Sequence, residues 1–168
     1  MAPKVAGIIR AVRQLSVPRA IVYGGLTVGT LDLIDAFTFF GLRSGAQPVA
    51  ILHSIASGFI GREPARTGGA STAILGFFTH FFVATCIVTV YVLASRLLPV
   101  LRTRWMVCGV AFGVVAYFFM TFVVVPLSHA GGGAISFSLP PAPIMANGIV
   151  IHMFGVGLPA AFFASRVR

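Results

Sequence analysis

The second half of this chain carries no charged side chain between Arg104 and Arg166, and this absence restricts the possible folds more than any other feature. A soluble helical bundle needs charged residues on the faces that meet water, whereas helices surrounded by lipid do not. Only 9% of the 168 residues are charged and 58% are hydrophobic, whereas an ordinary soluble domain has about 25% charged residues. The composition excludes a water-soluble enzyme and a disordered chain, and it predicts an all-α integral membrane protein.

Four apolar segments are long enough to cross a membrane, because a hydrocarbon core about 30 Å thick requires about 20 residues of α-helix. A shorter apolar stretch, residues 48–61, lies between the first two segments and is predicted to form an interfacial or re-entrant helix. Residues 20–168 then form one transmembrane domain that follows a basic arm, residues 1–19. The predicted spans are residues 20–42, 71–98, 105–127 and 143–165.

The positions of the basic residues predict the orientation. The net charge of +9 is distributed in short clusters beside the apolar segments, which is typical of membrane topology and not of a nucleic-acid-binding surface. With the N-terminus inside, only Arg43, Arg62 and Arg66 among the 12 Lys and Arg residues fall on the outer side. We therefore expect both termini in the cytoplasm. The first segment is longer than the apolar core of a signal peptide and contains two carboxylates, so we expect it to be retained.

The ionisable side chains inside the spans are the candidate functional site, because such groups are costly in lipid. If the spans are straight helices, the four Asp and His residues lie roughly 11 to 15 Å from the outer end. Helical phase places Asp32, His80 and His152 on faces that also carry small residues. The third span contributes a thioether and a hydroxyl at this depth. The predicted intramembrane polar layer consists of Asp32, Asp35, His80, Met120, Thr121 and His152.

Small residues on these faces are expected to let the helices approach closely. One glycine pair, Gly25 with Gly29 or Gly109 with Gly113, can serve the bundle and leave the other for a neighbour. We therefore expect a homo-oligomer or a membrane-protein partner in addition to the lipid bilayer. The predicted helix-packing positions are Gly25, Gly29, Gly76, Gly109, Gly113, Gly148 and Gly155.

The polar layer is expected to act as structural glue, and two alternatives are kept. An Asp hydrogen-bonded to a His can join helices, worth about 0.6 to 2 kcal/mol, so we expect a structural or assembly role. In the first alternative, a carboxylate beside an imidazole binds or conducts a proton or a cation, because the charges of the two groups are coupled. The second alternative is a metal or a haem with His80 and His152 as axial ligands.

No sequence motif indicates catalysis. The chain contains no nucleophile with an adjacent base, no metal-hydrolase signature and no cofactor loop. Cys86 and Cys108 have no metal-ligand spacing and are interpreted as packing residues. We therefore expect a non-enzymatic protein with no catalytic residue, no metal site and no cofactor, and we expect it to bind no nucleic acid.

Three runs of the second half resemble the YagU-like group of small bacterial inner-membrane proteins. They are GFFTHFFVATCIVTVYVLASRLLP, GVAFGVVAYFFMTFVVVPLS and HMFGVGLPAAFFASR. That group pairs a His early in one helix with a Pro near the end of the next and a His in the last, and the matching residues here are His80, Pro126 and His152. The resemblance implies a multi-pass architecture and a bacterial inner-membrane location. It implies no mechanism, because the group has no settled biochemical activity.

Overall fold

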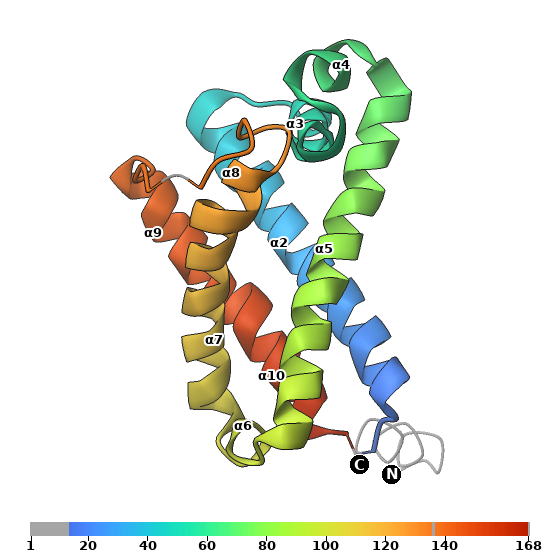
Figure 1. Ribbon diagram of the computed structural model, residues 1–168, viewed down its shortest axis with the longest axis vertical. Coiled ribbons are helices and arrows are strands. Elements are labelled where there is room, and N and C mark those ends of the chain that lie inside the picture. Colours follow the sequence, from blue (N-terminus) through green and yellow to red (C-terminus); the bar gives the residue numbers. More distant parts are fainter. Residues whose placement is uncertain (1–13, 136, 168) are drawn as a thin grey trace.

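The computed structural model describes residues 14–135 and 137–167, which fold into helices (Figure 1). Four helical spans are long and apolar enough to cross a membrane, as predicted, so the chain is a multi-pass membrane protein. The first span is α2 (Val17–Ser44) and the second is α5 (Gly69–Leu97). The other two spans are each made of three consecutive segments. These are α7 (Trp105–Phe119), η1 (Met120–Val124) and α8 (Val125–Leu127), and then α9 (Ala142–Ile151), η2 (His152–Gly157) and α10 (Leu158–Ser165).

Proline and glycine set several helix ends. Pro18 lies in the first turn of α2 and Pro48 begins α3 (Pro48–Ile60). A proline costs no hydrogen bond at these positions, because the first N–H groups of a helix have no partner within the helix. The first span ends at Gly45, whose φ of 68° lies in the left-handed region that favours glycine. Its backbone N–H donates to the oxygen of Gly41, which satisfies a carbonyl at the helix end. These breaks fix where the first span stops and where the short helix begins.

The predicted short helix α3 lies across one end of the bundle, beside the start of α5 (Figure 1). The structure therefore contains the short apolar helix predicted between the first two spans. The carbonyl of Leu52 faces Gly76 of α5, where a Cβ would overlap it. Two further short helices were not predicted from sequence, namely α4 (Arg62–Thr67) after α3 and α6 (Val100–Thr103) between the second and third spans. We call the end that contains α3, α4 and α8 the cleft end.

The opposite end of the bundle, where α6 and the first and last described residues lie, contains the main core and is called the packed end (Figure 1). Here α10 contacts the other three spans. Val88 and Val92 of α5 and Ala160 and Ala164 of α10 are completely buried. The backbone N–H of Leu15 donates to the oxygen of Arg166, 2.8 Å away, so the two described ends of the chain meet. In lipid, such an interface is held by close packing more than by the hydrophobic effect.

The glycines of the first span lie at its contact with the second span, as predicted. A Cβ on Gly25 would overlap the side chain of Thr85, and a Cβ on Gly29 would overlap the ring of Phe81. Both partners belong to α5. The glycine face of α2 is therefore used within the chain.

The glycines of the third span are also used within the chain. A Cβ on Gly113 would overlap the backbone oxygen of His152, and one on Gly109 would lie 2.9 Å from the oxygen of Gly157. Gly157 was not predicted as a packing residue, although it contacts α7 as closely as these two do. Because both glycine pairs are occupied, the expectation that one of them serves a neighbouring molecule is wrong.

The predicted packing positions of the fourth span, Gly148 and Gly155, both contact other spans. Gly148 lies against the ring of Tyr117, and Gly155 is buried, with Leu31 Cβ of α2 3.6 Å from where its own Cβ would lie. The π-helical segment η2 begins between these two glycines, at His152. A π segment has more residues per turn than an α-helix, so the phase calculated for a straight α-helix does not continue through it.

Candidate functional site

Two π-helical segments lie near the predicted polar residues. One, η1, begins at Met120, and the other, η2, begins at His152. Each precedes a proline inside its span, Pro126 or Pro159. A proline removes a backbone hydrogen bond and clashes with the preceding turn, and a wider turn relieves that clash. The intramembrane prolines were the sequence signal for these irregular segments, which are frequent at functional sites.

His80 joins the second span to the first. Its Nε2 donates a hydrogen bond to the backbone oxygen of Gly29 at 2.8 Å. The same nitrogen lies 3.9 Å from Oδ2 of Asp32, which is close enough for electrostatic attraction but too long for a hydrogen bond. Within residues 14–135 and 137–167, the Asp32 carboxylate accepts no hydrogen bond. The predicted pairing of Asp32 with His80 is therefore present as proximity and not as a direct bond.

His152 lies close enough to Asp32 for the two side chains to interact electrostatically. Its Nδ1 donates to the oxygen of Gly148 at 2.9 Å, so its Nε2 carries no proton when the ring is neutral. The imidazole packs edge-on against Tyr117, with the ring centroids 5.4 Å apart. The Tyr117 hydroxyl is buried and has no hydrogen-bond partner in the described part of the chain. A bare imidazole nitrogen and an unpaired hydroxyl thus belong to neighbouring rings beside the carboxylate.

Asp35 does not belong to the same set as Asp32. Its Oδ2 accepts a hydrogen bond from Nδ2 of Asn147 on α9 at 2.7 Å, one helical turn nearer the cleft end. Asn147 was missed from sequence because only ionisable residues were considered, although an amide inside an apolar span was a usable signal. The single polar layer predicted from sequence is therefore two sets: a bonded pair, and a looser group of Asp32, His80 and His152.

The third span contributes less to the polar group than predicted. Met120 lines the same cleft as His80. Thr121 makes no hydrogen bond to any of these side chains among the residues that the structure describes. The start of η1 at Met120 changes the helical phase here, as η2 does in the fourth span.

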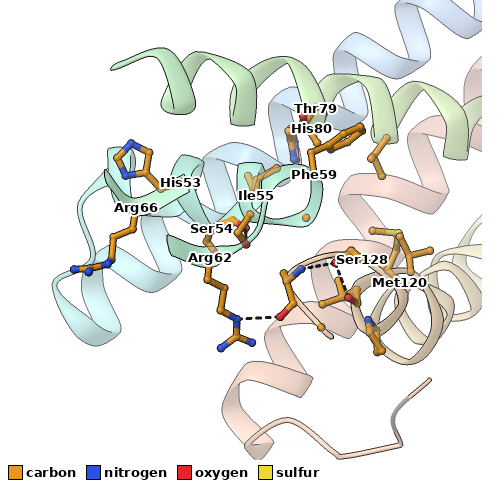
Figure 2. A pocket seen from close by; sticks show the side chains of 18 of the residues that line it. His53, Ser54, Ile55, Phe59, Arg62, Arg66, Thr79, His80, Met120 and Ser128 are labelled. Atoms are coloured by element: carbon orange, nitrogen blue, oxygen red, sulfur yellow. Dashed lines mark hydrogen bonds between the residues drawn. The ribbon is translucent and has the colours of Figure 1, made fainter. Parts of the chain in front are cut away.

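An open cleft of about 960 Å³ reaches this group from the cleft end (Figure 2). Its walls come from α3, α4, α5, η1 and α8 and from the loop after α8. Thr79 and His80 of α5 line its inner part, and the His80 side chain remains 12% exposed. Because His80 both lines the cleft and neighbours Asp32, it connects the carboxylate with the outside of the bundle.

Basic side chains line the outer part of the cleft. Arg62 Nε donates to the backbone oxygen of Ala130 at 2.9 Å, which holds the loop after α8 beside α4 (Figure 2). Arg66 pairs with Glu63 at 2.9 Å, on the exposed side of α4. The described residues that line the cleft include no Asp or Glu. Both arginines were interpreted from sequence as loop charges only, because the contact of Arg62 with the loop after α8 depends on tertiary structure.

The metal alternative finds no ligand set in the described part of the chain. Across residues 14–135 and 137–167, no three His, Cys, Asp or Glu side chains are grouped closely enough to hold a metal ion. Two axial histidines for a haem would each need a ring nitrogen free for the iron. Nε2 of His80 is hydrogen-bonded to Gly29, so an iron could bind this side chain only through Nδ1.

No protein-family model, curated protein or solved structure matches the chain. The function of the protein is therefore inferred from the geometry and chemistry of the site.

Proposed function

We propose that Asp32, His80 and His152 form an intramembrane proton-binding site that exchanges protons through the cleft. The observation that carries the proposal is the Asp32 carboxylate, which accepts no hydrogen bond from a described residue, while His80, 3.9 Å away, lines the cleft. A carboxylate that served only to join helices would be bonded, as Asp35 is bonded to Asn147. An unbonded intramembrane carboxylate is costly when it is charged, so it has a strong tendency to take up a proton.

The chemistry of the cleft favours a proton over a metal cation. A metal cation would find no carboxylate ligand among the described residues that line the cleft. A hard cation also requires about six oxygen ligands, whereas Asp32 supplies two. A proton requires one acceptor and a relay group, and an imidazole can take up a proton at one nitrogen while releasing one from the other. His80 occupies the position of such a relay.

The test is proton flux into proteoliposomes that contain a trapped pH-sensitive dye. We expect flux in the wild type and its loss in Asp32→Asn, because an amide cannot take up a proton at this position. The matched control is Asp35→Asn, which makes the same chemical change one turn away and keeps an acceptor for Asn147. We expect Asp35→Asn to conduct like the wild type. Equal flux in the wild type and Asp32→Asn would exclude Asp32 as the proton site.

A second variant tests the relay role of His80 while keeping its hydrogen bond to Gly29. His80→Gln retains a side-chain N–H that can donate to Gly29, but it cannot accept and release a proton as an imidazole does. We expect a wild-type folded yield and a flux reduced at least tenfold. Unchanged flux in His80→Gln would contradict the role of His80 as the relay.

Structural glue is the second candidate, favoured by two hydrogen bonds between helices. Asn147 donates to Asp35, and His80 donates to the backbone of Gly29. In this alternative the protein has a structural or assembly role, the wild type shows no proton flux, and Asp32→Asn folds at least as well as the wild type. A wild type without flux would favour this candidate over the proton site.

We further propose that the protein lies in a bacterial inner membrane with the packed end in the cytoplasm. The distribution of Lys and Arg and the YagU-like resemblance of the second half support this location. After replacement of Cys86 and Cys108 by alanine, Ser44→Cys at the cleft end and Thr103→Cys at the packed end provide exposed reporters. A membrane-impermeant thiol reagent should label Ser44→Cys in intact cells and Thr103→Cys only after the cells are opened. The reverse result would invert the orientation.

A further inference from the structure

Apolar side chains line the cleft on the sides of α3 and of the third span. They are Ile55 and Phe59 of α3 and Met120 and Val124 of η1, of which Figure 2 labels the first three. The cleft volume of about 960 Å³ lies at the upper end of the range of about 300 to 1,000 Å³ for ligand pockets. Proton exchange needs only a path for water, so this apolar space is larger than the proposed function requires.

A cationic group lies at the outer part of the same cleft. The guanidinium of Arg62 uses Nε for Ala130, and its two terminal nitrogens have no partner among the described residues. Arg66 is paired with Glu63, so its charge is largely compensated. Arg62 therefore presents two N–H-bearing nitrogens above an apolar wall. Arginine binds phosphate and carboxylate groups well, because its planar fork matches their geometry.

The cleft is next to a surface that fits lipid. Phe59 and Ile60 at the end of α3 are exposed to 55% and 37%, and Phe59 also lines the cleft. An exposed apolar edge on a helix that lies across the end of a transmembrane bundle suits the boundary between head groups and acyl chains. The cleft can therefore be entered sideways from the bilayer.

We propose that the cleft binds an anionic phospholipid of the surrounding leaflet, with one acyl chain between α3 and η1 and the phosphate on Arg62. The apolar walls fit an acyl chain, and the terminal nitrogens of Arg62 fit an anionic phosphate. The exposed apolar end of α3 indicates that the ligand comes from the bilayer. This inference does not depend on the proton site, since the lipid would lie at Arg62 and between α3 and η1, whereas His80 lines the inner part of the cleft.

The test is thermal stabilisation of the delipidated protein in neutral detergent, because a ligand that binds the folded state raises Tm. The probes are phosphatidylglycerol, phosphatidylcholine with the same chains, and free palmitate. We expect phosphatidylglycerol to raise the Tm of the wild type by several degrees and phosphatidylcholine to raise it much less. Equal shifts with both phospholipids would overturn the proposal. A shift with palmitate and none with phosphatidylglycerol would overturn the assignment to a bilayer lipid.

Arg62 variants test the head-group contact. Arg62→Gln should raise the phosphatidylglycerol concentration for half-maximal stabilisation about tenfold, since a charge-assisted contact is lost. Arg62→Lys keeps the charge and should retain most of the effect. The matched control is Arg43→Gln, which removes an exposed cation at the same end but outside the cleft. If Arg43→Gln and Arg62→Gln weakened the effect equally, the head group would not bind at Arg62.

Gly58 variants test the acyl-chain space. A Cβ on Gly58 would lie 3.7 Å from the side chain of Ser128, at ordinary contact distance, so Gly58→Ala should fold and bind lipid normally. Gly58→Leu extends into the cleft and should abolish the phosphatidylglycerol shift at an unchanged monomer size in detergent. Asp32→Asn should keep the full shift, which separates this proposal from the proton site. An undiminished shift in both Gly58→Leu and Arg62→Gln would place the lipid elsewhere.

Discussion

The two ends of the bundle are built differently, although both belong to the same four spans. At the packed end, α10 contacts α2, α5 and α7, and alanine and valine side chains there are completely buried. At the cleft end, an open space of about 960 Å³ lies between α3, α5 and the third span. Both π segments lie above α10, toward the cleft end (Figure 1). Asp35, His80 and Asn147 belong to the parts of their spans that are nearer this end.

The difference indicates that the packed end makes the fold rigid, whereas the cleft end is open to water or a ligand. Close contacts between small residues hold helices together in lipid, and the packed end has the larger share of them. Regions with fewer buried contacts open more easily, and functional segments are drawn from such regions. We therefore expect substitutions at the packed end to change stability and those at the cleft end to change activity or binding.

The largest expected effect is that of Gly109→Leu at the packed end. A Cβ here would lie 2.8 Å from the Cβ of Ala161 and 2.9 Å from the oxygen of Gly157, and a backbone atom cannot move aside. We expect destabilisation by about 3 kcal/mol or more, seen as loss of the monodisperse peak in detergent. The control at the cleft end is Gly58→Ala, which should behave like the wild type. A normal peak for Gly109→Leu would contradict the assignment of close packing to this end.

The next effect compares two valines on the same helix. Val88 is completely buried against the first span, whereas Val83 lines the cleft. Val88→Ala leaves a closed cavity and should destabilise by about 1 kcal/mol, while Val83→Ala only enlarges an open space. Thermal unfolding followed by circular dichroism would measure both. Equal losses of Tm would remove the distinction between the two ends.

A smaller effect concerns the bonded polar pair at the cleft end. Asp35→Ala, Asn147→Ala and the double variant form a cycle whose coupling we expect to be about 0.6 to 1.7 kcal/mol, the range for hydrogen bonds between membrane helices. Unfolding in a graded detergent mixture would measure it. The control cycle uses Asp32→Ala in place of Asp35→Ala, together with Asn147→Ala. Asp32 has no bond to Asn147, so the losses in this cycle should be additive. Additivity in both cycles would show that Asp35 and Asn147 do not pair.

The smallest loss of stability is predicted for Tyr117→Phe. Its hydroxyl is buried without a described partner, so its removal breaks no hydrogen bond and relieves a desolvation penalty, and we expect no loss of stability. At the packed end, Tyr91 donates to the backbone oxygen of Leu101 at 3.0 Å, so Tyr91→Phe should cost about 1 kcal/mol. The difference in Tm between the two variants is the measurement. A larger loss in Tyr117→Phe would mean that its hydroxyl is bonded after all.

The four spans and their approximate ends could be predicted from the amino-acid sequence alone. This was possible because the length of an apolar segment and the absence of charge are local properties, and lipid requires both in every span. Sequence also identified Asp32 and His80 as neighbours, since α2 and α5 are regular α-helices whose phase and depth can be calculated. Gly25 and Gly29 were correctly assigned to a close helix contact for the same reason.

The sequence could not predict which polar groups bond or where the bundle is open, because both depend on tertiary structure. The π segments change the helical phase in the third and fourth spans, so the position of Thr121 could not be calculated for a straight helix. The pairing of Asp35 with Asn147 joins residues 112 positions apart. The cleft likewise depends on α3, α5 and η1 lying side by side. Such contacts follow from how several helices pack at once, and no single segment specifies them.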